Sequence, residues 1–204
     1  MLAGAILPMV GVLREGSMEA RENASAAIFS LSFLDENKIT IGGTPGAIEA
    51  LVELLENGSP GGKKDAASAL FNLCIYEGNK SRAVRAGIMR PLLNILKDFS
   101  TSGLVDEVLV ILSVLVSHHE GKAALSKANS ISLLIDILRA RQPFNKEYAT
   151  ALLFALCHKN SENLACVRRL GAAIPLTEIA KTGSERAKRK AISLLEHMVK
   201  LRVL

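Results

Sequence analysis

A pattern with a period of about 42 residues runs through this 204-residue chain, and periods in this range are typical of helical solenoids. Its clearest marker is a tripeptide like Gly-Ala-Ile, which recurs once per period and begins at Gly4, Gly46, Gly87, Asn129 and Gly171. A second series with the same spacing comprises Asn37, Asn79, Gly121 and Asn163. In a helical solenoid each unit buries its apolar face against its neighbours. The chain is therefore expected to fold as a stack of similar units.

Each repeat is predicted to contain three helices. Asn79 is expected to cap the N-terminus of a short first helix, and Gly87 is expected to end it in the left-handed conformation. A second helix follows, with an apolar stripe at i, i+3, i+4 and i+7 that consists of Ile48, Leu51, Val52 and Leu55. Residues 57–62 are turn-forming, so the third helix is expected from Lys63 to about Tyr76. Prolines that mark the first turn of second helices are Pro8, Pro91 and Pro175.

The repeats divide the sequence without leaving room for a linker or a second domain. Complete repeats are expected at about 37–78, 79–120, 121–161 and 162–201, after a partial repeat at 1–36. The partial repeat has no first helix, so its apolar stripe of Ile6, Met9, Val10 and Leu13 would lack an upstream neighbour. Terminal repeats normally present a polar outer face. We therefore expect that the chain either belongs to a longer protein or associates with another copy through this edge.

Composition limits the location and the redox state of the protein. Hydrophobic residues make up 49% of the chain, but no apolar run is long enough to cross a bilayer, and no secretory signal begins the sequence. A cytoplasmic location is expected, with the nucleus as an alternative. Cys74, Cys157 and Cys166 are odd in number and lack CxxC spacing, so they are expected to be reduced core residues.

No motif in the sequence indicates catalysis or a cofactor. His118-His119 and Cys157-His158 are adjacent, so neither pair is expected to present two metal ligands on one helix face. Glycines 58, 61 and 62 lack the spacing of a phosphate-binding loop, and the pair at 42–43 is expected to stop a helix. No nucleophile has a credible general base. We therefore expect a protein without enzymatic activity, metal or small-molecule substrate.

The C-terminal segment is basic. Residues 181–204 contain seven Lys or Arg and two Glu, which gives this segment a net charge of +5, equal to that of the whole chain. The cluster from Arg186 to Lys190 has three interpretations: a nuclear-localisation signal, a phosphate-binding patch, or a solvated helix face. The solvated face is favoured, and because no aromatic residues are interleaved with the basic ones, nucleic acid binding is not.

At the level of motifs the chain resembles armadillo repeats, and more narrowly those of plant U-box ubiquitin ligases. The segments that carry the armadillo resemblance are 46–55 and 66–73, and those that carry the plant U-box resemblance are 30–32, 37–38, 68–80 and 183–191. The resemblance implies an all-α, right-handed superhelical solenoid forming one domain over residues 1–204. It also implies that a U-box elsewhere in the parent protein recruits the ubiquitin-charged E2, while this region binds protein substrates or regulators, receptor kinases and small GTPase regulators among them.

The resemblance points to the third helices as the binding surface, since in armadillo proteins they line a concave groove. Asn72 alone matches the asparagine that binds the main chain of an extended peptide in that family, and the tryptophans of nuclear-import receptors are absent. Charges at matching places alternate in sign, which favours a partner of mixed charge or a folded domain; they are Glu22, Lys64, Glu147 and Arg189. The expected partner-binding residues are Lys64, Ser68, Asn72, Tyr76, Glu147, Arg189 and His197. The first four follow one another at i, i+4, i+8 and i+12, away from the apolar side of their helix.

Two functions from different classes are compatible with these features. The first is the substrate-binding module of a plant U-box ubiquitin ligase, and the second is a free armadillo scaffold or transport adaptor. A U-box upstream of residue 1 would distinguish them. Neither hypothesis identifies the partner, because a solenoid surface recognises its partner through an array of exposed side chains without a transferable motif.

Overall fold

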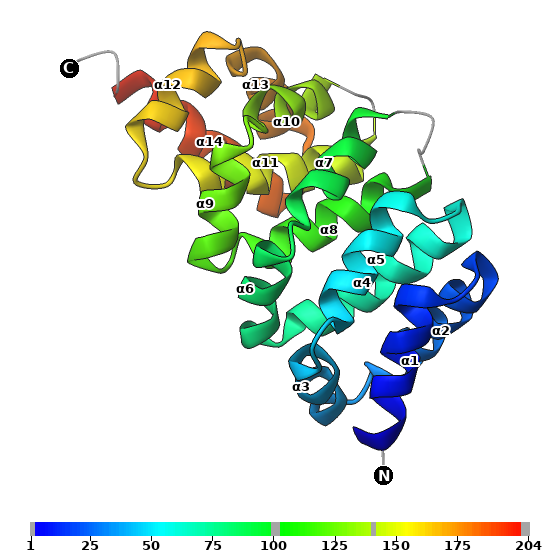
Figure 1. Ribbon diagram of the computed structural model, residues 1–204. Helices are drawn as coiled ribbons and strands as arrows, with labels where there is room; N and C mark the ends of the chain where they lie inside the picture. The colour runs from blue at the N-terminus through cyan, green and yellow to red at the C-terminus, as the bar shows by residue number, and fades with distance from the viewer. Residues whose placement is uncertain (1–2, 99–102, 140–141, 201–204) are drawn as a thin grey trace. The chain divides into compact units, whose positions relative to one another are not determined.

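The computed structural model describes residues 3–98, 103–139 and 142–200, and these contain fourteen α-helices and no strand (Figure 1). The helices form three series that alternate along the chain. The first helices are α3 (Asp35–Gly43), α6 (Glu77–Arg85), α9 (His119–Lys127) and α12 (Ser161–Arg169). The second helices are α1 (Ala3–Glu15), α4 (Ala47–Asn57), α7 (Met89–Lys97), α10 (Ile131–Arg139) and α13 (Ala173–Thr182). The third helices are α2 (Met18–Leu31), α5 (Pro60–Ile75), α8 (Val105–Leu115), α11 (Pro143–Cys157) and α14 (Glu185–Lys200). The all-α prediction is confirmed.

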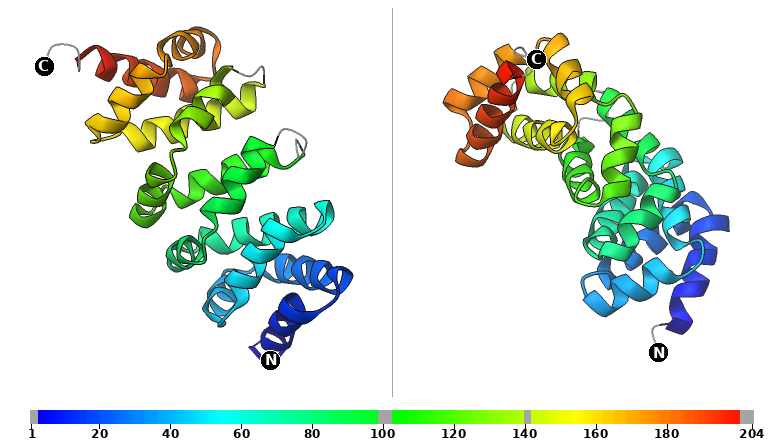
Figure 2. Two further views of the ribbon diagram at one scale, coloured as in Figure 1. Left: turned by 45° about the horizontal axis from the view of Figure 1, so that its top comes forward. Right: turned by 90° about the vertical axis from the view of Figure 1, so that its left-hand side faces the viewer.

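Residues 1–121 and 122–204 form two compact units. In the first unit the third helices lie side by side, with α5 packed between α2 and α8 (Figure 2). In the second unit α11 packs against α14. Within each unit, neighbouring repeats thus bury their third helices against one another, as expected for a solenoid.

The predicted left-handed turns between first and second helices are present. Gly46, Gly87 and Gly171 have φ angles of 82°, 83° and 76°, and Asn129 at the equivalent place has a φ of 52°. This conformation is accessible to glycine without a steric penalty and is tolerated by asparagine better than by most residues. The tripeptide series in the sequence is therefore a series of chain reversals.

The asparagine series has a different role from the predicted one. Asn79 does not cap α6, which begins two residues earlier at Glu77; it is fully buried, and its Nδ2 donates to the carbonyl oxygens of Leu73 at 3.0 Å and Lys38 at 2.8 Å. Asn37 and Asn163 likewise donate to Leu31 and Leu156 at 2.8 and 3.0 Å. Each asparagine is the third residue of its first helix and provides a donor for a carbonyl at the end of the preceding third helix, where intrahelical donors run out.

At two positions near these asparagines another group lies so close to the backbone that only glycine fits. A Cβ on Gly42, which is buried in α3, would overlap the amide of Asn79. Gly121 replaces asparagine in α9, and a Cβ there would overlap the carbonyl oxygen of Leu115 at the end of α8. Helix α3 ends with the glycine pair at 42–43, as predicted, and Gly42 also makes room for a side chain of the next repeat.

Serine caps start three of the third helices, and one of them moves a predicted boundary. The Oγ atoms of Ser17, Ser59 and Ser184 accept from backbone amides three residues later, at 3.3, 3.1 and 3.2 Å. Helix α5 consequently begins at Pro60 and not at Lys63, because the capping serine precedes the glycine pair. Prolines 91 and 175 lie in first turns as predicted, whereas Pro8 lies inside α1.

The apolar stripe of α1, which was expected to lack an upstream neighbour, is covered by helices that follow it in the chain. Ile6, Val10 and Leu13 are at most 2% exposed because α2 and α4 cover them. The exposed apolar side chains of α1 are instead Leu7 and Val12, at 62% and 41%. Self-association through this edge remains a prediction, and it would involve these two residues.

Candidate functional site

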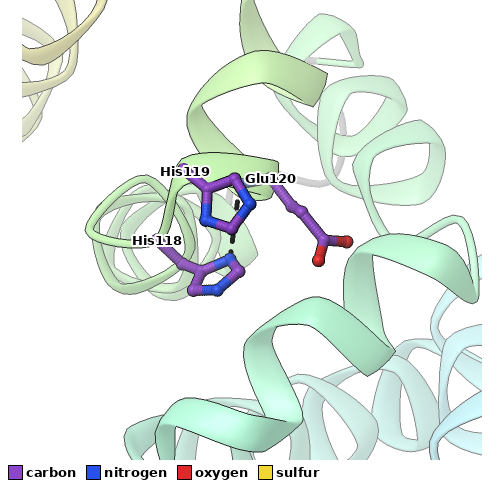
Figure 3. A group of neighbouring side chains, drawn as sticks. All are labelled: His118, His119 and Glu120. Carbon is purple, nitrogen blue, oxygen red and sulfur yellow. Dashed lines mark hydrogen bonds between the residues drawn. The ribbon is translucent and has the colours of Figure 1, made fainter.

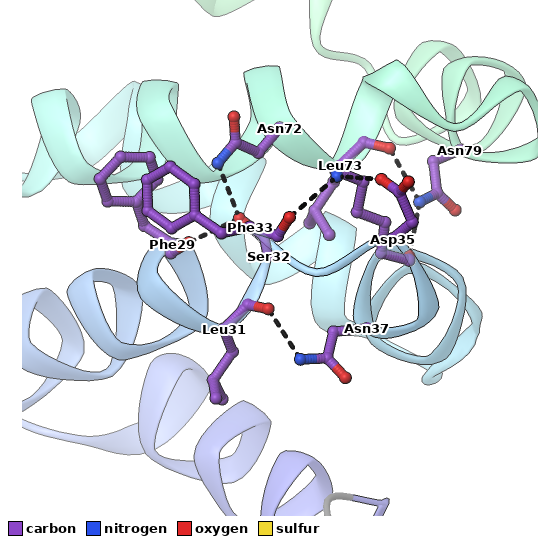
Figure 4. A network of polar contacts seen from close by, with 10 residues as sticks. Phe29, Leu31, Ser32, Phe33, Asp35, Asn37, Asn72, Leu73 and Asn79 are labelled. Atoms are coloured by element: carbon purple, nitrogen blue, oxygen red, sulfur yellow. Dashed lines mark hydrogen bonds and ion pairs between the residues drawn. The ribbon is translucent and has the colours of Figure 1, made fainter.

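The predicted row on α5 is only partly exposed to solvent. Lys64 and Tyr76 are exposed and Ser68 is half-buried, but Asn72 is only 8% exposed. The Nδ2 of Asn72 donates to the Oγ of Ser32 at 3.1 Å, and that hydroxyl donates to the carbonyl of Phe29 at 2.6 Å (Figure 4). The expectation that Asn72 faces solvent is wrong, because α2 packs against α5 and ends beside this side chain.

Asn72 therefore connects two repeats. Its amide nitrogen faces Ser32, and its oxygen points away from that serine (Figure 4). Replacement of Asn72 would remove a buried hydrogen bond between α5 and α2, so it would change stability as well as any binding. Lys64 and Tyr76 are the exposed members of the row, and their replacement would not break a hydrogen bond of this kind.

The other three predicted residues lie in the second unit. Glu147 accepts a hydrogen bond from the Oγ of Ser184 at 2.5 Å through its Oε2. Arg189 is exposed and its Nε donates to the carbonyl of Glu185 at 3.3 Å, whereas His197 is exposed with its Nδ1 at 2.6 Å from the carbonyl oxygen of Ser193. Arg189 and His197 thus present polar groups to solvent, while Glu147 holds the first turn of α14.

The hydrogen bond between Glu147 and Ser184 has a counterpart in the first unit. In the first unit, Glu22 on α2 accepts from the Oγ of Ser59, which caps α5. In both cases the glutamate lies on a third helix and the serine, 37 residues later, caps the third helix of the next repeat. Glu22 and Glu147, predicted as charges of a binding groove, therefore help to hold neighbouring helices in register. The constant spacing between glutamate and serine is the sequence signal for this contact.

The basic cluster on α14 consists of solvated and locally paired side chains. Lys188 forms an ion pair with Glu185 at 3.0 Å, and Arg186 is exposed. Burial, reinforced by the charge of Arg186, lowers the pKa of Lys190. Residues 201–204 of the basic segment lie outside the described residues. The cluster fits the solvated helix face that the sequence favoured.

His118, His119 and Glu120 bring their ligand atoms within 4.8 Å of one another (Figure 3). The two histidines do not share one helix face, because His118 precedes α9, but its ring turns toward the first turn of that helix. However, the Nδ1 of His118 accepts from the amide of Glu120 at 3.3 Å, and Arg85 donates to the Glu120 carboxylate at 3.3 and 3.4 Å. These groups act as a helix cap and as an ion pair between α6 and α9.

Two of the three cysteines are core residues as the sequence predicted, whereas the third, Cys166, is not. Cys74 and Cys157 are buried, and desolvation raises the pKa of each to about 12. A thiol with such a pKa stays protonated at neutral pH and is a poor nucleophile and metal ligand. Cys166 is half-buried.

Besides Tyr76, which was predicted as a partner-binding residue, three exposed apolar side chains at the ends of third helices were not expected from the sequence: Phe33, Leu34 and Ile75. Phe33 and Leu34 follow α2 and are each 65% exposed, while Ile75 and Tyr76 end α5 and are 52% and 39% exposed. Phe33 pairs with Phe29 at a ring distance of 5.0 Å, next to Asn72 (Figure 4). A comparison of equivalent positions in successive repeats would have found them, because they are the last residues before successive first helices.

The helix series, the left-handed turns and the contacts between third helices define an armadillo repeat solenoid. A designed armadillo repeat protein superposes with a TM-score of 0.82 over 96% of this chain and 82% of its own, at 24% identity. A second designed armadillo repeat protein, solved in complex with the peptide (KR)4, gives a TM-score of 0.79 at 23% identity over 96% of this chain and 82% of its own. At these identities the likeness establishes the fold alone.

Sequence comparison identifies the family. The profile described as plant U-box protein ARM repeat region matches residues 4–200, and the chain belongs to this family. U-box domain-containing protein 9 of Arabidopsis thaliana is 45% identical over 198 residues, which are 96% of this chain and 42% of that protein. U-box domain-containing protein 12 of the same species is 51% identical over 193 residues, or 95% of this chain and 29% of that protein. U-box domain-containing protein 11 of A. thaliana is 58% identical over 93 residues, which cover 46% of this chain and 15% of that protein.

The chain spans less than half the length of these relatives. The family profile that it matches describes their armadillo repeat region. None of the helices in the described ranges has both the length and the apolar character needed to cross a membrane.

Proposed function

We propose that this chain is the region through which a plant U-box ubiquitin ligase binds protein substrates or regulators, while the U-box catalyses transfer from outside residues 4–200. The family match over these residues is the observation that carries the proposal. The internal contacts support it, because Asn79 and Asn163 of the first helices use their side-chain amides to join neighbouring helices. The groups left for a protein partner are therefore the exposed side chains on the surface of the stacked helices.

The third helices supply the binding surface in this proposal. In the first unit Lys64, Ser68 and Tyr76 present a cation, a hydroxyl and a phenol along one helix, and α2 and α8 flank them. In the second unit Arg189 and His197 are exposed on α14. The helices that carry these groups are already packed, so their backbone loses little conformational freedom when a protein partner binds. Asn72 and Glu147 support this surface by fixing the helices that carry it.

Competition in a ubiquitination assay tests the proposal. The full-length parent, E1, E2 and a partner identified by crosslinking to this chain are combined, and ubiquitination of the partner is measured with increasing amounts of the isolated chain. We expect the chain to inhibit modification of the partner without inhibiting autoubiquitination of the parent, because it occupies the partner and leaves the U-box free.

A variant of the chain with Lys64→Ala and Tyr76→Ala tests the binding surface. It should compete less well than the native chain while keeping the same thermal midpoint. The isolated chain with E1 and E2 should form no ubiquitin chains. Unchanged modification of the partner in a large excess of the native chain would show that partner selection resides elsewhere in the parent.

A further inference from the structure

Four exposed apolar side chains lie at the ends of two third helices that pack against each other in the first unit. The patch consists of Phe33 and Leu34 after α2 and of Ile75 and Tyr76 at the end of α5. The two pairs occupy the same places in successive repeats, on helices that pack against each other. We call this set the apolar patch.

The next repeat shows that these places tolerate polar residues. The residues directly before the nine-residue α9 are Ser117 and His118, and they follow the end of α8 as Phe33 and Leu34 follow the end of α2. Apolar side chains are therefore not needed to terminate the third helix or to start the first one. Contiguous exposed apolar groups on a protein surface commonly mark an interaction site.

Near the apolar patch the negatively charged side chains are exposed and the positively charged ones are buried. The exposed groups beside it are carboxylates, since the side chains of Asp35 and Glu77 are 92% and 63% exposed and Glu36 is also exposed. The two lysines of the same segments are buried: Lys38 and Lys80 are 7% and 9% exposed, and each ammonium lies 2.5 Å from the carboxylate three residues before it. A partner that approaches the patch meets carboxylates before it meets ammonium groups.

Asn72 provides a hydrogen-bond acceptor beside Phe33 of the apolar patch. The side-chain oxygen of Asn72 points away from Ser32, and the rings of Phe29 and Phe33 lie beside that side chain (Figure 4). Because the amide nitrogen is held by Ser32, the orientation of the oxygen is fixed before any partner arrives. A preoriented acceptor beside an aromatic pair suits a donor from a peptide main chain or from a basic side chain.

We infer that the apolar patch docks a short protein segment whose aromatic or aliphatic side chains are flanked by lysine or arginine. The apolar side chains would be buried on Phe33, Leu34, Ile75 and Tyr76, and the flanking cations would meet the carboxylates. The same carboxylates disfavour anionic lipid surfaces and nucleic acid phosphates. The inference rests on the proposed function, because it names the kind of protein segment that this region would recognise.

Selection from a displayed library of random short peptides on the immobilised native chain provides the test. Enriched peptides should contain an aromatic or aliphatic pair flanked by Lys or Arg, and one of them, synthesised with a fluorescent label, is the probe for affinity measurements by polarisation. The test variant carries Phe33→Ser and Leu34→His, which copy Ser117 and His118 at the junction of α8 and α9, where the helix ends have the same spacing as at the junction of α2 and α3. It should weaken binding of the probe by about tenfold or more, as for loss of central interface anchors.

The control is Ile174→Ser, which removes an exposed apolar side chain from α13 in the second unit and should leave the affinity of the probe unchanged. Acidic or wholly polar selected peptides, or equal affinity of the probe for the native chain and the test variant, would overturn the inference. So would a dimer of the native chain, seen by sedimentation, that the test variant abolishes, since the patch would then be covered by a second copy.

Failure of this inference can be distinguished from failure of the proposed function. If the test variant still competes for the ubiquitination partner as well as the native chain does, the apolar patch is not the docking site although the region binds partners. If neither protein competes, the proposed function itself fails, whatever the selected peptides show.

Discussion

Asn79 provides the sharpest test of how the repeats are joined. Its side chain is fully buried; its Nδ2 donates to the carbonyls of Lys38 and Leu73, and its Oδ1 accepts from Arg82. Loss of these hydrogen bonds in Asn79→Ala costs about 1–3 kcal/mol. Alanine returns roughly 0.6 kcal/mol through its higher helix propensity, so we expect a net loss of about 0.5–2.5 kcal/mol.

Urea unfolding followed by far-UV circular dichroism measures this loss as a lower transition midpoint. The matched control is Asn94→Ala in α7, where the asparagine is exposed; there the propensity gain should act alone and the stability should stay equal or rise by up to about 0.6 kcal/mol. If both variants shift the midpoint equally, the hydrogen bonds of Asn79 do not hold the repeats together.

The close contact between Gly42 and Asn79 can be tested by combining substitutions at both residues. A Cβ on Gly42 would overlap the Asn79 amide, so Gly42→Ala should destabilise the native chain by displacing that side chain. In the Asn79→Ala background the overlap is removed, and the same substitution should be neutral or should stabilise by up to about 1 kcal/mol, because alanine replaces glycine within a helix. Additive effects of the two substitutions would refute the close approach that links α3 to α6.

Three further predictions concern the core, a cap and the thiols. Leu70→Ala should lower the free energy of unfolding by about 2–5 kcal/mol, because Leu70 is fully buried between packed helices; an unchanged urea midpoint would contradict its placement. Ser184→Ala should cost about 0.5–2 kcal/mol, since it removes both the cap of α14 and the donor to Glu147, and the thermal midpoint should fall accordingly. At pH 8 a thiol reagent should label Cys166 in the native chain and label Cys74 and Cys157 only after denaturation, because a pKa of about 12 keeps the buried pair protonated; rapid labelling of all three in the native state would be inconsistent with that burial.

The local features of the repeat could be predicted from the sequence. The left-handed turns at Gly46, Gly87, Asn129 and Gly171 follow from residue types that tolerate positive φ. The apolar stripes and the buried cysteines follow from helical periodicity, which depends on residues within one or two turns. These properties are set by short stretches of chain, so a single sequence with a clear repeat was sufficient to determine them.

The partners of polar side chains were decided by the tertiary structure. Asn72 was expected to face solvent, but its donor is taken by Ser32, which is 40 residues away in sequence. Glu147 was expected to be free for a partner, but it holds Ser184 of the next repeat. In both cases the hydrogen-bond partner is a serine that comes within reach only because neighbouring third helices pack against each other. The sequence of a solenoid repeat determines its own helices. Whether a polar side chain on those helices faces solvent or forms a hydrogen bond depends on the repeat that stacks against it.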